Sequence, residues 1–203
     1  MKKLTALLLA AVLLATCFVG CAKTGDKKET IVVGYTIYAP MNYLDESGEL
    51  IGFDTDLAKA VFENLGYNVM FKEIDWNSKY TDLSSGNIDC VWNGFTCNTA
   101  DDDGVLRSAK VDFSYNYMEN RQVIVTKNGG ITSAEDLKGK VAAVESGSAG
   151  ETYAKGFDGV TTKGFTKQTD CLFEVNAGTC DFAVLDAQLA KSYAGKGDYA
   201  ELV

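Results

Sequence analysis

The chain contains no histidine and a single proline in 203 residues, and its six cysteines form no CxxC pair. Histidine is the side chain that most often moves protons near neutral pH, and zinc sites draw on histidine or closely spaced cysteines. GxGxxG and P-loop motifs are absent as well. These absences count against a zinc site, a nucleotide cofactor and an enzyme with a nucleophile–base pair, so we expect no metal, no cofactor and no catalysis.

Positive charge is also scarce, because 19 Lys and Arg face 28 Asp and Glu, which gives a formal net charge of -9. An acidic chain repels phosphate backbones, so nucleic-acid binding is disfavoured.

Only one long apolar run occurs, Leu4 to Val19, and it follows Lys2 and Lys3. This pattern is typical of a secretory signal over residues 1–20 rather than a membrane span. Phe18 to Cys21 is similar to a lipobox, which predicts lipidation at Cys21, a tether over residues 21–29, and an exported protein held at the outer face of the cytoplasmic membrane. The alternative is an ordinary signal peptide, with Cys21 incidental.

Four cysteines remain beyond this leader: Cys90, Cys97, Cys171 and Cys180. An exported chain permits disulfides, and Cys171 with Cys180 is the pair to test first. Buried free thiols are the alternative.

Apolar runs and helical patterns alternate twice along the chain, which is typical of two doubly wound α/β lobes. In the first half we expect a helix that Asp54 caps and Gly66 ends. The other elements expected there are strands at Ile31–Val33, Asn68–Ile74 and Ile88–Trp92 and a short helix at Lys79–Leu83.

The pattern restarts after Tyr117, where Ser133 is expected to cap a helical turn. We place lobe 1 at residues 30–117, a hinge crossing at 118–121 and lobe 2 at 122–203. The strands expected in lobe 2 are Gln122–Thr126, Val141–Val144, Val160–Thr162 and Asp181–Leu185, and its helices are Ser148–Lys155, Thr169–Ala177 and Ala187–Ala194.

Two segments carry a family resemblance: GFDTDLAKAVFENLG at Gly52–Gly66 and VDFSYNY at Val111–Tyr117. With the strands that flank them, they resemble the bacterial extracellular solute-binding proteins of the amino-acid ABC transporter type, family 3, from about Thr30 onward. The resemblance implies a type II periplasmic-binding-protein-like fold with a ligand cleft between its lobes. It also implies a monomeric amino-acid carrier with a membrane permease as partner. In the family a C-terminal segment returns to finish lobe 1, so by this comparison we expect the sequence to be truncated at its C-terminus and lobe 2 to be incomplete.

The resemblance implies that Arg107 binds the ligand carboxylate and that Asp186 binds the ligand ammonium. A guanidinium donates two parallel hydrogen bonds to a carboxylate. The alternatives are a solvated arginine and a helix cap at Asp186. Asn93, Gly94 and Thr96 match positions that supply ligand contacts in lobe 1, or else form a simple turn.

Ser148 and Ala149 stand at a strand-to-helix junction, where backbone N–H groups favour an anion. Tyr38 and Trp76 match aromatic positions that flank the ligand side chain, with core packing as the alternative. By the same resemblance, Thr36 stands where some relatives carry an aspartate that binds a basic side chain, and Glu145 stands where a glutamine binder has a basic residue. This comparison favours a polar or cationic ligand. The acidic run at 101–103 lacks the remaining acids of an EF-hand and is expected to be a solvated loop.

Three other functional interpretations are compatible with the sequence. The fold also serves as a ligand-sensing extracellular module of receptors, and a few of its members are dehydratases. A fragment without a function of its own is the remaining alternative.

Overall fold

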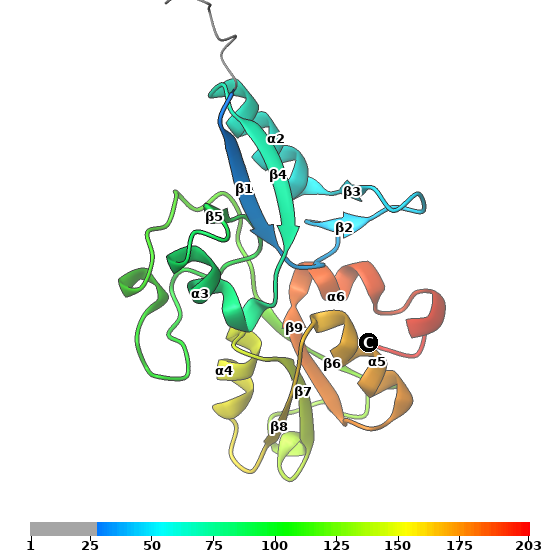
Figure 1. Cartoon of the computed structure of the whole chain (residues 1–203). Coiled ribbons are helices and arrows are strands. Elements are labelled where there is room, and N and C mark those ends of the chain that lie inside the picture. Colours follow the sequence, from blue (N-terminus) through cyan, green and yellow to red (C-terminus); the bar gives the residue numbers. More distant parts are fainter. Residues whose placement is uncertain (1–27) are drawn as a thin grey trace, which may run out of the picture.

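The computed structural model describes residues 28–203, which contain a three-stranded and a two-stranded sheet in lobe 1 and a four-stranded sheet in lobe 2 (Figure 1). The predicted signal sequence and Cys21 lie outside the described residues. Lobe 1 holds three parallel strands in the order β4-β1-β5, which are β4 (Asn68–Glu73), β1 (Thr30–Tyr35) and β5 (Cys90–Val91). Its other elements are the hairpin β2 (Tyr43–Leu44) and β3 (Leu50–Ile51), α2 (Phe53–Asn64), η1 (Trp76–Ser78), α3 (Lys79–Ser84) and η2 (Arg107–Ala109).

Helix α2 begins at Phe53 with Gly52 in the N-cap position, so the capping role predicted for Asp54 is wrong. Gly52 has a φ of 125°, and a Cβ there would lie 2.3 Å from the carbonyl oxygen of Met41, so only glycine fits. Asp54 lies within the first turn, where its buried carboxylate accepts a hydrogen bond of 2.8 Å from the Tyr117 hydroxyl. This bond ties the start of α2 to the segment that leaves lobe 1.

Lobe 2 holds a four-stranded sheet in the order β6-β9-β7-β8, in which only β6 runs antiparallel to its neighbour. Its elements are β6 (Gln122–Thr126), η3 (Glu135–Leu137), β7 (Val141–Glu145), α4 (Ala149–Lys155), β8 (Thr161–Phe165), α5 (Gln168–Ala177), β9 (Phe182–Asp186), α6 (Ala187–Tyr193) and η4 (Gly197–Tyr199). The cap predicted at Ser133 is wrong, because the Asp136 carboxylate accepts a hydrogen bond from the Ser133 N–H instead.

Strands β7 and β9 are buried on both faces, as continuous apolar runs in parallel sheets require. Along β7, Ala142 and Val144 pack in one core cluster with Ala154 of α4. Ala143 points the other way, into a cluster with residues of α5 and α6. Figure 1 shows α4 on one side of this sheet and α5 and α6 on the other, which is the doubly wound arrangement.

The lobes are joined by residues 112–121, which form neither helix nor strand. They also share core packing, since Tyr38 and Met41 of lobe 1 lie in the same cluster as Leu185 and Leu189 of lobe 2. Cys171 and Cys180 belong to this cluster as free thiols. No helix in residues 28–203 has the length and apolar composition needed to cross a membrane.

Candidate functional site

A small cavity of about 10 Å³ lies between the lobes, next to the carboxyl ends of β7 and β9. Every predicted site residue except Tyr38 lines it. Its lining comprises Trp76, Asn93, Gly94, Thr96 and Arg107 of lobe 1 and Gln122, Glu145, Ser148, Ala149, Gln168 and Asp186 of lobe 2. A volume of this size holds about one water molecule, so an amino acid enters only if the lobes separate.

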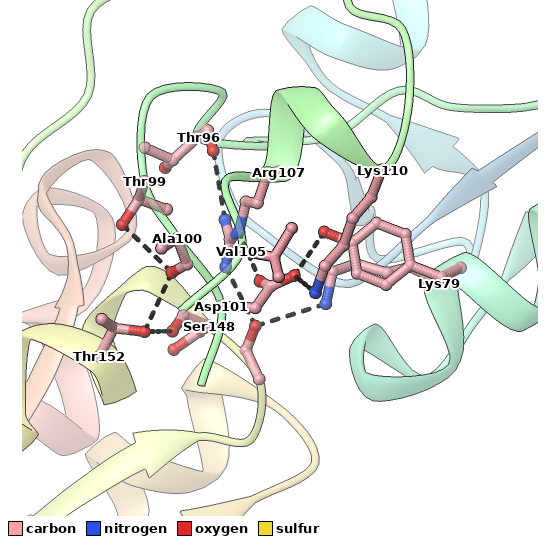
Figure 2. A network of polar contacts seen from close by, with 12 residues as sticks. Lys79, Thr96, Thr99, Ala100, Asp101, Val105, Arg107, Lys110, Ser148 and Thr152 are labelled. Atoms are coloured by element: carbon pink, nitrogen blue, oxygen red, sulfur yellow. Dashed lines mark hydrogen bonds and ion pairs between the residues drawn. The ribbon is translucent and has the colours of Figure 1, made fainter. Parts of the chain in front are cut away.

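Arg107 crosses the boundary between the lobes from η2, and its side chain is 1% exposed. Its Nε donates to Asp101 at 2.8 Å, and its terminal nitrogens donate to the carbonyl oxygens of Thr96 at 3.4 Å and Gly147 at 3.1 Å (Figure 2). A guanidinium has five N–H donors. These three bonds therefore leave one N–H on each terminal nitrogen without a hydrogen bond to residues 28–203.

Asp101 holds Arg107 in place. The expectation that residues 101–103 form a solvated loop is therefore wrong for Asp101. The Asp101 carboxylate also accepts hydrogen bonds from Lys110 at 2.8 Å and from the Tyr80 hydroxyl at 2.7 Å, and its side chain is 13% exposed. Burial opposes ionisation, but the hydrogen bonds from Lys110, Tyr80 and Arg107 outweigh it and lower the pKa of Asp101 to about 2. A charged Asp101 therefore fixes the guanidinium at physiological pH.

Asp186 ends β9 with its carboxylate surrounded by amides. Its side chain accepts hydrogen bonds from Asn120, from Gln122 at 2.6 Å and from Gln168 at 2.6 Å. Asp186 occupies the position before α6 but makes no capping hydrogen bond with its side chain. Burial raises the pKa of Asp186, while the hydrogen bonds from Gln168, Asn120 and Gln122 oppose this shift. Sequence reasoning found the acid but not the three amides.

Glu145 ends β7, and its side chain also lines the cavity. Burial, followed by the negative charge of Asp186, raises the pKa of Glu145 to about 8. Glu145 was noted in the sequence only for its effect on ligand charge, and Gln122 and Gln168 carried no sequence signal.

An aromatic group closes the lobe 1 side of the cavity. The ring of Trp76 meets that of Phe95 edge-on, with 4.9 Å between centroids. The Lys79 ammonium lies 5.0 Å from the Trp76 centroid and donates to the carbonyl oxygen of Gly147 at 3.4 Å. Burial, followed by the positive charge of Arg107, lowers the pKa of Lys79 to about 8. Lys79 therefore adds a second cation beside Arg107.

Three of the remaining predicted residues shape the cavity rather than point free polar groups into it. The Asn93 amide bonds to Thr36 and Asn42. A Cβ on Gly94 would lie 2.6 Å from the Tyr38 ring, which explains the glycine. Tyr38 itself packs behind Gly94, in the core cluster that spans the lobes.

Ser148 precedes α4, directly beside Ala149 in the cavity lining. Its hydroxyl oxygen accepts a hydrogen bond of 3.1 Å from the Glu151 N–H, and this bond caps the helix. The hydroxyl proton of Ser148 remains available to an acceptor in the cavity.

A much larger open groove of about 1120 Å³ runs along β5 and residues 111–120. Its lining contains aromatic and acidic side chains but no lysine or arginine. A carboxylate would find no cationic partner there, so the small cavity is the better candidate for a charged ligand.

Two α/β lobes with opposed charged groups in a cavity between them define a two-lobe solute-binding protein. Residues 31–192 match the bacterial extracellular solute-binding proteins, family 3, and the chain belongs to this family. The fold class expected from the sequence is thereby confirmed.

Among curated relatives, the arginine-binding extracellular protein ArtP of Bacillus subtilis is 32% identical, with 98% of this chain and 78% of ArtP covered. A probable amino-acid ABC transporter-binding protein of Haemophilus influenzae is 38% identical, and the match covers 70% of this chain and 56% of that protein. Among solved structures, an ancestral arginine-binding protein bound to arginine has a TM-score of 0.77 at 37% identity, covering 87% of this chain and 78% of that one.

Proposed function

We propose that the protein binds a free amino acid between its lobes and delivers it to the permease of an ABC transporter. The observation that carries this proposal is that Arg107 of lobe 1 and Asp186 of lobe 2 line the same cavity. An α-amino acid needs a donor pair for its carboxylate and an acid for its ammonium. A polar or cationic side chain is favoured, and the relatives with named ligands include arginine-binding proteins.

The state of Arg107 supports this role. Asp101 and the two carbonyl oxygens orient the guanidinium and leave one N–H on each terminal nitrogen. Two such N–H groups suit the two oxygens of a carboxylate. On the other lobe, three amides hold the Asp186 carboxylate toward the cavity, as an ammonium acceptor requires.

Binding would proceed by closure of the lobes about residues 118–121. Lobe 1 (30–117) would receive the ligand through Arg107, Thr96 and Trp76, and lobe 2 (122–203) would then add Ser148 and Asp186. Closure would bury the ligand and produce a surface that the permease distinguishes from the open form. We further propose that the protein is a monomer, that Cys21 carries a lipid anchor, and that it is a carrier rather than an enzyme.

A thermal-shift screen of the full chain against the common amino acids tests this proposal. A ligand at a hundredfold over its dissociation constant stabilises the protein by about 2.7 kcal/mol, or roughly 5–10 °C in Tm. We expect Arg107→Ala to weaken binding at least about 30-fold, since removing one partner of a buried charge pair costs about 2–5 kcal/mol. Arg107→Lys keeps the charge but loses the paired donors, and should be impaired almost as much.

Lys191→Ala is the matched control, because Lys191 is an exposed cation on α6 and lies outside both the cavity lining and the hinge. A wild-type chain that melts cooperatively but binds none of the amino acids would contradict the proposed function. Full affinity in both Arg107 variants would contradict the site.

A further inference from the structure

The cavity contains one more carboxylate than an ordinary amino acid requires. Glu145 and Asp186 end the neighbouring parallel strands β7 and β9, so both side chains emerge at the same edge of the lobe 2 sheet. Glu145 is 4% exposed and Asp186 is 6% exposed, and both line the cavity. Neither carboxylate has a lysine or arginine nitrogen within 4.0 Å among residues 28–203.

The two cations of the site, Arg107 and Lys79, form their hydrogen bonds with groups other than Glu145 and Asp186. Arg107 pairs with Asp101 at 2.8 Å. The Lys79 ammonium, which is 2% exposed, donates to the carbonyl oxygens of Trp76 at 3.2 Å and Gly147 at 3.4 Å. A single α-ammonium neutralises one carboxylate, and Asp186 with its three amides is the better prepared of the two. Glu145 is then a buried acid without a countercharge, which is costly when ionised.

We propose that Glu145 is a specificity-determining residue, which selects an amino acid with a second positive charge on its side chain. This inference rests on the proposed function and names the ligand class of the same site. A cationic side chain would supply the missing countercharge. Trp76, on the opposite wall, offers an aromatic face that also attracts cations. A neutral side chain of the same size would form no charge pair with Glu145.

Proton release follows from this arrangement. The groups that face Glu145 are Asp186 on β9, Gln168 and Cys171 on α5, Lys79 on α3 and Asp75 before η1. Burial, followed by the Asp186 charge, raises the pKa of Glu145 to about 8, so the group holds a proton at neutral pH. A cationic ligand displaces that proton, whereas a neutral ligand leaves it in place. Affinity for a cationic ligand therefore increases with pH, by at most about tenfold per pH unit.

L-Arginine and L-citrulline are suitable probes, because they differ mainly in the charge of the side-chain end group. Isothermal titration of the full chain from about pH 5.5 to about pH 8.5 gives both affinity and proton release. We expect L-arginine to bind at least about tenfold more tightly than L-citrulline near pH 8. Its affinity should fall toward acidic pH, while that of L-citrulline stays constant.

Glu145→Gln keeps the shape of the protonated acid but cannot ionise. We expect it to lower L-arginine affinity at least about tenfold near pH 8, to leave L-citrulline within about twofold and to abolish proton release. Glu135→Gln, at an exposed position on η3, should bind both probes as the wild type does.

Three results would overturn the role of Glu145: equal wild-type affinities for the two probes, unchanged L-arginine binding in Glu145→Gln, or an equal loss for both probes. A cooperatively folded wild type that binds no amino acid at all would instead refute the proposed function, and the inference with it.

Discussion

At the scale of single residues, Asp186 shows how much a ligand group depends on its neighbours. Its carboxylate accepts from Asn120, Gln122 and Gln168. Asp186→Asn removes the negative charge. It also replaces one accepting oxygen by an N–H donor, which faces the amide N–H donors of the three neighbours. We expect ligand affinity to fall by at least about 30-fold, since breaking a buried charged pair costs about 2–5 kcal/mol. Titration calorimetry with the best ligand measures the loss.

Asp170→Asn is the control for this substitution, because Asp170 is exposed in the first turn of α5. Wild-type affinity in Asp186→Asn would show that another group binds the ligand ammonium.

Residues within a recognisable motif could be predicted from the sequence, whereas their supporting residues could not. Arg107 and Asp186 were predicted, and the fold brings both to the cavity lining. Asn120 and Gln122 lie two residues apart where the chain enters β6, and Gln168 begins α5, so only the folded chain reveals that they meet at Asp186. Asp101 looked like part of a solvated acidic run, because nothing in the sequence shows that it meets Arg107.

At the scale of elements, the loop of residues 99–105 in lobe 1 makes non-covalent contacts with α4 of lobe 2. Asp102 pairs with Lys155 at 2.6 Å. The carbonyl oxygen of Ala100 accepts a hydrogen bond of 3.5 Å from Thr152 (Figure 2). Both members of the ion pair are about half exposed, so their contribution is at most about 1 kcal/mol. The pair favours the closed arrangement of the lobes.

Asp102→Asn should therefore raise the dissociation constant of the ligand by at most about fivefold at low salt, and the difference should shrink as salt increases. Titrations at low and high sodium chloride measure this effect. Asp158→Asn breaks an exposed ion pair with Lys138 that lies within lobe 2, and should leave affinity unchanged. Equal effects of the two substitutions would show that the Asp102 pair does not act on closure.

Elements were predicted well where apolar periodicity sets them and less well at their ends. Strand β6 has the predicted bounds, and the two α/β patterns correspond to the three-stranded sheet of lobe 1 and the four-stranded sheet of lobe 2. The start of α2 was misplaced, because the side chain that looked like a cap bonds to distant Tyr117. The cap at Ser133 failed because Asp136 provides the acceptor.

At the scale of the whole molecule, buried acids make stability depend on pH. Burial raises the pKa of Asp54 to about 6 and that of Glu145 to about 8. The pKa values of these two acids in the unfolded state are near 4. At pH values between the unfolded-state and folded-state pKa values, the folded state binds more protons than the unfolded state. Their stabilising contribution is present at low pH and is lost as pH rises through about 6 and about 8. Lys79, with its pKa lowered to about 8, adds the opposite trend only above that pH.

We therefore expect the Tm without ligand to decrease between about pH 5 and about pH 8, by on the order of 5 °C, since 1 kcal/mol corresponds to roughly 2–4 °C. Calorimetry across this range measures the slope. Glu145→Gln should flatten its upper part, and Glu135→Gln should not. A Tm that rises steadily through this window would contradict the assignment of these two acids as buried and protonated.

The guanidinium of Arg107 is held within lobe 1 by Asp101 and by the carbonyl oxygen of Thr96, and neither contact depends on lobe 2. A free arginine side chain loses up to about 2 kcal/mol of rotamer entropy when it is immobilised. Here that entropy is lost when the chain folds, so the ligand carboxylate meets a side chain that is already ordered. A larger share of the interaction energy is therefore retained as affinity.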